Sequence, residues 1–279
     1  MKPAPFEYHR PRSVQEAASL ISGEQGFVKI LAGGQSLGPM LNMRLAQPDA
    51  LIDVTGIDEL KAVSEDGGEL RMGACLTHAD IEDGRVPDVT RGLMPHVARN
   101  IAYRAVRNRG TVGGSLGHAD PAADWMSALP LLGAHVEIWS PAGRRLIPVE
   151  DLMTSSFATV LGAEEMISAV VVAKLSPRAR WGFRKFSRKA GEFGHAIGGV
   201  LHDPERGVFR AVMGAIDAAP IVVADATALF GGDFGEGLAE RLDRQAVESL
   251  LSERGMSDPY DRQLHVAMLK RAAGDASAP

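Results

Sequence analysis

The 279-residue chain contains a single cysteine, Cys75, and this scarcity excludes several kinds of site. One thiol cannot form an intramolecular disulfide, and it cannot build a cysteine-rich zinc or iron–sulfur centre. The eight histidines are scattered and form no HExxH pair, so no metal is expected on this chain. Within 70-LRMGACLT-77, Cys75 is expected to be a small, semi-buried apolar residue.

Basic clusters and long apolar runs are also missing. The net charge is −5 and lysine and arginine form only short runs, which argues against nucleic acid as a main partner because phosphate binding needs a concentrated basic face. No apolar segment reaches the roughly 18 residues of a membrane span, and residues 1–13 lack the apolar core of a signal peptide. These absences predict a cytoplasmic protein with no membrane span. Hydrophobic residues, 45% of the chain, are enough for a well-buried core.

Capping and turn signals predict the elements of the first half. Ser13 followed by Glu16 is a capping-box pattern, and 65-EDGG-68 between two apolar segments is a hairpin signal. The sequence predicts a helix from Ser13, strands at 28–33 and 50–54, a hairpin about 65–68, a short helix capped by Thr77, a helix over 88–101 and a hairpin over 134–149.

From about residue 164 the pattern changes to successive strands followed by helices, which indicates an α+β unit. The expected strands cover 165–172, 181–188, 196–202 and 208–216, and the expected helices cover 220–231, 237–253 and 258–273. Residues 274–279 are expected to be a frayed tail.

Two glycine motifs stand out, 32-AGGQS-36 after a strand and 111-TVGGS-115. Successive main-chain N–H groups can hold an anion without a lysine, so the paired motifs predict a diphosphate site closed by two pieces of main chain. Neither GxxxxGK[ST] nor GxGxxG spacing occurs, which excludes a P-loop and argues against a dinucleotide-binding Rossmann domain. The alternative is that both motifs are tight turns.

Three side chains near the second motif are candidates for a structural role or a ligand contact. Asp120 followed by Pro121 is expected to cap a helix. Asp124, one turn inside that helix, is expected either to accept hydrogen bonds from a nucleotide ribose or to stabilise the first turn. His118, the nearest histidine, either contacts the ligand or is a hydrogen-bonded loop residue.

The motifs resemble those of the FAD-binding medium subunit of molybdenum hydroxylases, the group of xanthine dehydrogenase and bacterial carbon monoxide dehydrogenase. The resemblance covers essentially the whole chain. It is carried by AGGQS with its tail LGPMLNMRLAQP and LIDV, by 107-RNRGTVGGSLGHADPAADW-125, by 183-FRKFSRKAGEF-193 and by VMGAIDAAP.

The resemblance implies a two-lobed, PCMH-type FAD-binding domain over 1–175 and a smaller α+β domain over 176–279. It implies diphosphate contacts for the first motif, phosphate and ribitol contacts for the second, a ribose contact for Asp124, a main-chain contact of Ile167 to adenine, and positions beside the isoalloxazine for Lys185 and Phe193. The expected cofactor-binding residues are Ala32, Gly33, Gly34, Gln35, Ser36, Leu37, Thr111, Gly113, Gly114, Ser115, His118, Asp124, Ile167, Lys185 and Phe193.

Some positions depart from the family pattern. Ser115 stands where many relatives have Asn or Asp, Glu192 replaces a more usual Asp, and Phe193 replaces a frequent tyrosine. The loss of that hydroxyl is expected to change the shielding of the flavin ring without abolishing FAD binding.

By resemblance, the chain is expected to be an electron-transfer subunit with no catalytic side chain of its own. Because one cysteine cannot ligate a cluster, molybdopterin is expected on a large subunit and [2Fe–2S] clusters on a small one, assembled as a dimer of heterotrimers. FAD then passes electrons to NAD, a quinone, a cytochrome or oxygen. The alternatives are a stand-alone FAD-dependent oxidase or reductase similar to the enolpyruvyl-glucosamine reductases, with Glu192 and His195 as acid–base candidates, and an interaction module without FAD. The substrate stays open.

Overall fold

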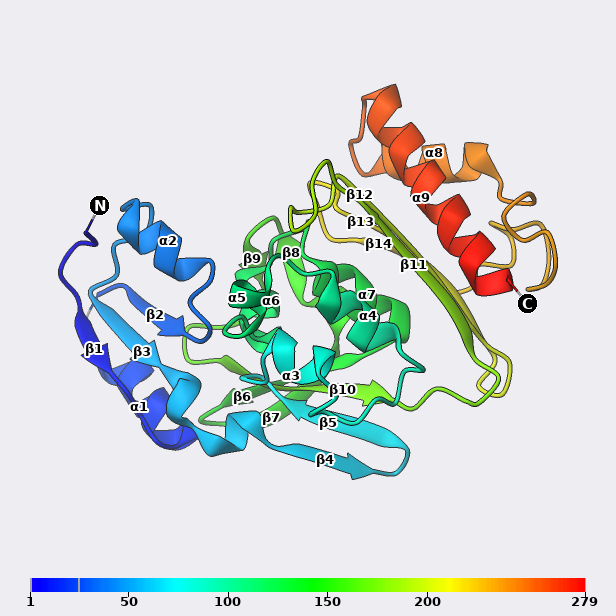
Figure 1. The fold of residues 1–279 in the computed structure, drawn as a ribbon. Coiled ribbons are helices and arrows are strands. Elements are labelled where there is room, and N and C mark those ends of the chain that lie inside the picture. Colours follow the sequence, from blue (N-terminus) through cyan, green and yellow to red (C-terminus); the bar gives the residue numbers. More distant parts are fainter. Residues whose placement is uncertain (1, 25, 279) are drawn as a thin grey trace.

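The computed structural model describes residues 2–24 and 26–278. An N-terminal lobe holds a parallel sheet of order β1-β3-β2. It is drawn in blue in Figure 1. The elements of this lobe are β1 (Glu7–His9), α1 (Val14–Gly23), β2 (Val28–Leu31), α2 (Leu37–Asn42) and β3 (Ala50–Asp53).

Helix α1 begins where its capping signal predicted. The Ser13 side chain accepts a hydrogen bond from the Glu16 N–H at 3.1 Å. The Glu16 carboxylate accepts from the N–H of Arg12 at 2.8 Å rather than from that of Ser13, so the capping box is only half formed. Val14 and Ala17 are buried in the core that α1 shares with β3.

The middle of the chain forms a five-stranded antiparallel sheet of order β4-β5-β10-β6-β7, covered on one face by helices α3 to α7 (Figure 1). The hairpin predicted at 65–68 is confirmed, with Gly67 and Gly68 both at positive φ. The elements are β4 (Val63–Asp66), β5 (Glu69–Gly73), α3 (His78–Glu82), α4 (Leu93–Arg99), α5 (Arg104–Arg107), α6 (Val112–His118), α7 (Asp124–Leu132), β6 (His135–Ser140), β7 (Gly143–Pro148), β8 (Met153–Ser155), β9 (Ala158–Thr159) and β10 (Met166–Ala173), with 3-10 turns at Val54–Gly56, Asp58–Lys61 and Val149–Asp151.

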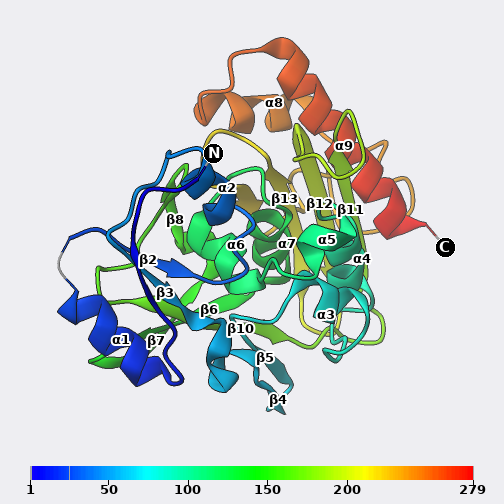
Figure 2. The same ribbon diagram turned by 60° about the vertical axis from the view of Figure 1, so that its left-hand side comes forward.

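A second antiparallel sheet, β11-β12-β13-β14, lies on the other side of these helices, and α8 and α9 cover its outer face (Figures 1 and 2). Its elements are β11 (Arg180–Phe186), β12 (Ala196–Asp203), β13 (Val208–Gly214), β14 (Ile221–Val223), α8 (Arg244–Glu253) and α9 (Pro259–Ser277). Helix α7 is buried between the two sheets, where Leu129 shares one core with Val170 and Val212.

Several expected elements differ from the observed ones for local reasons. Helix α4 starts only at Leu93, because the Asp88 carboxylate accepts from Thr90 N–H and Gly92 N–H and holds a turn. Residues 220–231 contain strand β14 and turns rather than a helix, and the helix predicted over 237–253 starts at Arg244. Residues 274–277 are not frayed, since α9 continues through them and Ala276 is 1% exposed.

The cap predicted at Asp120 is also wrong. Its carboxylate accepts from the N–H of Ala122, which forms a turn, and the helix begins at Asp124 with Ala123 as N-cap. None of the helices in the described part of the chain combines the length and apolar character that a membrane crossing requires.

Candidate cofactor site

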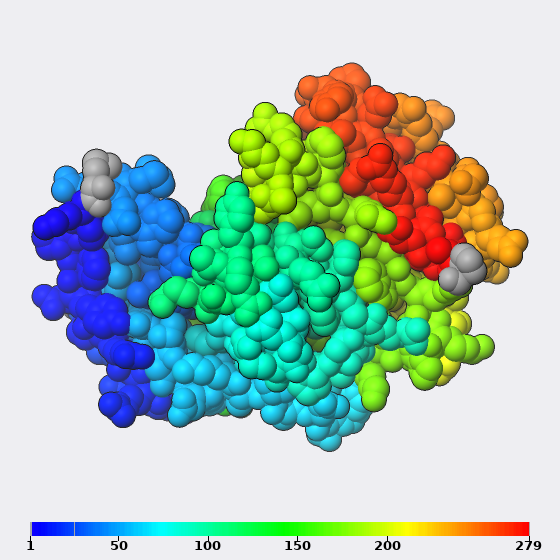
Figure 3. All heavy atoms as spheres, in the orientation of Figure 1, coloured from blue at the N-terminus to red at the C-terminus, as the bar shows by residue number. Residues whose placement is uncertain are grey.

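A cavity of about 880 Å³ lies between the N-terminal lobe and the middle of the chain. Figure 3 shows the corresponding notch between the blue and green parts of the surface. Both glycine motifs line this cavity, together with residues from the loop between β11 and β12 and from the segment before β10. Pockets of this volume and mixed lining are typical of cofactor sites. The sequence-predicted residues that line it are Ala32, Gly33, Gly34, Gln35, Ser36, Leu37, Thr111, Gly113, Gly114, Ser115, His118, Asp124, Ile167 and Phe193.

The first motif leaves its main-chain donors uncommitted. Within the described residues, no acceptor is found for the N–H groups of residues 33–37. Gly34 adopts a left-handed conformation, with φ of 71°, which a residue with a Cβ adopts only at a cost. Ser36 is the N-cap of α2 but makes no side-chain cap bond. The loop therefore offers a row of amides and a hydroxyl to a ligand.

The second motif has a different structure, because it is a helix rather than a loop. Thr111 is the N-cap of α6 and accepts from the Gly114 N–H at 3.0 Å, while the Gly113 N–H donates to Ala74 O at 2.9 Å. The N–H of Ser115 donates to Thr111 O. The expectation that Gly113 and Gly114 offer free amides is thus wrong.

Close packing explains the second pair of glycines instead. A Cβ placed on Gly113 would lie 2.4 Å from the Cβ of Ala74, and one on Gly114 would lie 2.7 Å from Thr111 Oγ1. Both distances are far inside van der Waals contact. These glycines let α6 approach the end of β5, so that the helix can form one wall of the cavity.

The two regions touch directly. A Cβ on Gly33 would lie 2.1 Å from the carbonyl oxygen of Arg109 and 2.7 Å from the Cα of Gly110. The first motif is therefore seated on the residues just before the second one. This contact fixes the two walls of the cavity relative to each other.

Asp124 and Lys185 form a buried ion pair at the cavity. Lys185 Nζ lies 2.9 Å from Asp124 Oδ1, donates to Oδ2 at 3.0 Å, and also donates to Asn100 O at 2.8 Å. Burial raises the pKa of Asp124, while the ammonium of Lys185 opposes that shift. Lys185 itself does not line the cavity.

This pair changes the interpretation of both residues. The family resemblance assigned Asp124 to the ribose and Lys185 to the isoalloxazine, and these groups of FAD are separated by the ribityl chain and the diphosphate. The charged groups of these two side chains lie only 2.9 Å apart. Only Asp124 faces the cavity, and Lys185 acts on it through that carboxylate.

His118, Ile167 and Phe193 lie at the cavity on three different elements. His118 is half-buried in the last turn of α6, 5.2 Å from the ring of Phe157, and burial lowers its pKa. Ile167 is 8% exposed on β10, within 3.9 Å of the Cβ position of Gly117. Phe193 is 59% exposed in the β11–β12 loop.

Sequence reasoning missed other lining residues. Tyr103 and Lys29 carry no motif signal, and Cys75 was expected only as a core residue, yet all three line the cavity. Burial raises the pKa of the Cys75 thiol to about 12. The available signal was proximity, because Cys75 follows β5 and Lys29 lies three residues before the first motif.

His78 is a further buried residue at the cavity. Its Nδ1 accepts from the Trp125 indole N–H at 3.1 Å, which fixes the neutral tautomer with its proton on Nε2. Burial lowers the pKa of His78 to about 4. A Cβ on Gly110 would lie 2.8 Å from His78 Nε2, so His78 supports the turn that leads into the second motif.

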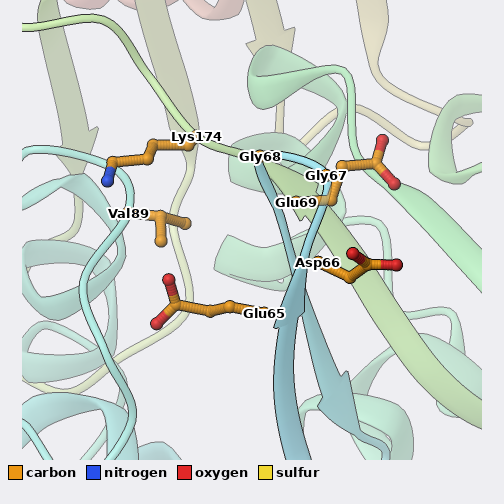
Figure 4. Close-up of a pocket in the computed structure, with 7 residues that line it drawn as sticks. All are labelled: Glu65, Asp66, Gly67, Gly68, Glu69, Val89 and Lys174. Carbon is orange, nitrogen blue, oxygen red and sulfur yellow. The ribbon is translucent and has the colours of Figure 1, made fainter.

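A smaller hollow of about 230 Å³ lies at the tip of the β4–β5 hairpin (Figure 4). Apart from Val89, its lining residues are exposed, and the carboxylates of Asp66 and Glu69 point away from Lys174. Exposed acidic groups at a hairpin tip are solvated and create no specific site. In the described part of the chain, no cluster of three or more His, Cys, Asp and Glu side chains is suited to a metal ion.

The comparisons with known proteins agree with this geometry. Residues 4–174 match the family described as FAD binding domain in molybdopterin dehydrogenase. The chain belongs to this family. The resemblance inferred from the motifs is confirmed, and with it FAD as the cofactor and membership of a multi-subunit oxidoreductase.

Individual relatives match all or most of the chain. It is 34% identical over 284 residues to the nicotine 6-hydroxylase medium subunit of Paenarthrobacter nicotinovorans, covering 100% of this chain and 99% of that one. It is 35% identical over 196 residues to the carbon monoxide dehydrogenase medium chain of Hydrogenophaga pseudoflava, covering 70% and 68%.

Solved structures confirm the α+β fold. Carbon monoxide dehydrogenase from Hydrogenophaga pseudoflava matches with a TM-score of 0.89 at 29% identity, over 99% of this chain and 98% of that chain. Quinoline 2-oxidoreductase from Pseudomonas putida 86 matches with a TM-score of 0.83 at 29% identity, over the same shares. This family member therefore has the fold of a medium subunit of a molybdenum hydroxylase.

Proposed function

We propose that FAD occupies the cavity between the N-terminal lobe and α6, with its diphosphate on the loop from Ala32 to Leu37. The observation that carries this proposal is the row of uncommitted N–H groups over residues 33–37 at a cavity of about 880 Å³. Each hydrogen bond from an N–H to a charged oxygen contributes ~1.5–3 kcal/mol, so this loop alone accounts for much of the expected affinity. The donor set and the cavity size both fit the cofactor.

The wall of the cavity formed by α6 offers no free N–H groups from Gly113 and Gly114, and it serves to shape the cavity. Helix α6 presents Gly114 and Ser115 to the cavity, and α7 presents Asp124, whose carboxylate is paired on both oxygens with the Lys185 ammonium. We assign Asp124 to a polar group of FAD, with Lys185 orienting its carboxylate. His118, Ile167 and Phe193 complete the lining.

When bound, FAD supplies one- and two-electron transfer, and this chain binds it, orients it and excludes water. We propose that electrons arrive from [2Fe–2S] clusters on a small partner subunit, after hydroxylation of substrate at molybdopterin on a large one. This subunit then passes them to an external acceptor. Supporting the proposal, the relatives are named as subunits of nicotine 6-hydroxylase, carbon monoxide dehydrogenase and caffeine dehydrogenase. The chain has one cysteine, too few for a cluster.

We also propose that residues 1–175 form the FAD-binding unit and that 176–279 form a separate α+β unit, within a dimer of heterotrimers. The last strand of the middle sheet ends at Ala173, and the next sheet begins at Arg180. Limited proteolysis between these residues, followed by size separation, tests the division.

The decisive experiment removes FAD from the assembled complex. Substrate should still reduce the iron–sulfur clusters, while reduction of the natural acceptor should stop and return when FAD is added. Acceptor reduction at the full rate without FAD would refute the electron route. Acceptor turnover by this chain alone would favour a stand-alone oxidase or reductase.

A further inference from the structure

Two exposed aromatic residues line the cavity although they come from different parts of the chain. Tyr103 is 63% exposed at the N-cap of α5, and Phe193 is 59% exposed in the β11–β12 loop. Both line the cavity.

Tyr103 contacts the loop that carries Phe193. A Cβ placed on Gly191 would lie 2.9 Å from Cε1 of Tyr103, 3.1 Å from Cζ and 3.2 Å from Cδ1. Gly191 has a φ of 85°, so it needs glycine for its conformation as well as for this approach. The main chain of the loop thus rests on the tyrosine ring, two residues before Phe193.

Little else holds this loop in place. Between residues 188 and 193, the only hydrogen bonds in the described chain are local ones to Lys189 O, from Glu192 N–H and from the Ser187 hydroxyl. None of them reaches the helices beside the cavity. The ring of Tyr103 provides a packing contact between this loop and the start of α5.

Tyr103 is itself firmly held. The residue before it, Ala102, is in the left-handed region with φ of 42°, and its carbonyl accepts from Arg107 Nη1 at 3.1 Å. Arg107 also donates to Ile101 O and to both carboxylate oxygens of Glu82. This buried clamp fixes the backbone of Tyr103, so the ring is a rigid support for the loop.

We propose that Tyr103 is a positioning residue that holds the β11–β12 loop so that Phe193 covers the mouth of the cofactor cavity. Its effect on FAD passes through Phe193, and it controls how easily small molecules from solvent reach the cofactor. The inference rests on the proposed function, since it places FAD in this cavity. In this proposal, the position of Phe193 over the cavity depends on the contact between Tyr103 and the β11–β12 loop.

The test uses the full chain loaded with FAD. The Stern–Volmer slope for acrylamide quenching of flavin fluorescence measures exposure of the ring. The second-order rate of reoxidation by O₂ is measured in the same samples, in which the reduced cofactor gives two electrons and two protons to O₂ and H₂O₂ forms. For Tyr103→Ala both quantities should rise roughly threefold or more, because the cover opens.

Two matched variants separate this role from general effects. Tyr103→Phe should behave as wild type, since it keeps the ring that contacts Gly191. Tyr260→Ala removes an equally exposed tyrosine, 61% exposed at the start of α9, and should change neither quantity. Gly191→Ala leaves Tyr103 in place and should raise the quenching slope and the reoxidation rate as Tyr103→Ala does. If Tyr103→Ala fails to bind FAD, Gly191→Ala provides the test of the proposal.

A double variant tests the route through Phe193. Phe193→Ala should match Tyr103→Ala, and the pair together should add nothing further, as expected for residues that act as one unit. Additive increases, or slopes for Tyr103→Ala and Gly191→Ala equal to wild type, would overturn the proposal. Failure of wild type to bind FAD in a titration would instead overturn the proposed function, so the two failures are distinguishable.

Discussion

The two glycine motifs are nearly the same in letters and different in structure. In 32-AGGQS-36 the amides of residues 33–37 have no acceptor in the described chain and are available to a ligand. In 111-TVGGS-115 the amides of Gly113 and Gly114 are bonded to Ala74 and Thr111, inside helix α6. Paired glycines thus serve two purposes in one cavity. The first region binds, and the second supplies a closely packed wall.

Asp124, which follows the second motif in the sequence, forms an ion pair with Lys185. Breaking this pair has the largest expected effect on the free energy of unfolding. Lys185→Met leaves a buried carboxylate without its cation and should lower the free energy of unfolding by about 3–5 kcal/mol. Urea denaturation of the full chain measures it. Lys185→Met/Asp124→Asn removes both charges and should recover a large part of the loss.

The pH dependence of that deficit has a definite sign. The pKa of Asp124 is raised on folding, so the folded state binds a proton more readily than the unfolded chain, and stability falls as pH rises. Without Lys185 the shift grows, so the Lys185→Met deficit should shrink as pH is lowered from 7 toward 5. A deficit that stays constant across this range would contradict the role of the Asp124 charge.

His78 packs against Gly110 in the turn before the second motif. Its titration gives the next largest expected effect on stability. Its pKa is lowered from 6.5 to about 4 on folding, so its contribution to stability is present above pH 6.5 and is lost as pH falls toward 4. Between pH 7 and 4.5 wild type should therefore lose about 2–3 kcal/mol more than His78→Asn, whose side chain does not titrate. Equal losses in urea titrations at the two pH values would exclude this origin.

Much of the fold is predictable because local signals agree with the global structure. The Ser13 cap, the EDGG hairpin and the strand predicted at 196–202 follow from capping signals, turn signals and a short apolar run between turns. Helix α6 does not, because its three glycines oppose a helix by about 1 kcal/mol each. The contact of Gly113 with Ala74 overrides that preference, and such a contact is invisible before β5 and α6 are placed together.

The candidate site divides in the same way. The first motif carries its chemistry in consecutive residues, so its position at the cavity could be predicted. Two other features of the site depend on residues far apart in the sequence. Tyr103 contacts Gly191, 88 residues later, and Asp124 pairs with Lys185, 61 residues later. The family resemblance assigned Asp124 to the ribose and Lys185 to the isoalloxazine, and only the fold shows that the two side chains form an ion pair.

Gly113 in α6 and Gly38 in α2 allow a direct test of how tightly the two helices are packed. Gly113→Ala should destabilise the protein by about 1–3 kcal/mol, because its Cβ overlaps Ala74. Gly38→Ala in α2 meets no atom within 4 Å and should be neutral or stabilise by about 0.5–1 kcal/mol, as alanine does in helices. Thermal unfolding of both variants measures this, and similar losses at both positions would mean that α2 is packed as tightly as α6.

The smallest effect distinguishes the hydroxyls that precede the two helices. Thr111 caps α6 through Oγ1, so Thr111→Val should lower stability by about 1 kcal/mol. Ser36 makes no cap bond, so Ser36→Ala should leave the FAD-free chain almost unchanged and weaken FAD binding roughly five- to tenfold, the value of one lost hydrogen bond. Denaturation of the FAD-free chain and FAD titration, on both variants, separate the two quantities. If Ser36→Ala destabilised the fold and left FAD affinity intact, both motifs would be helix caps of the same kind, and the division between a binding loop and a packed wall would fail.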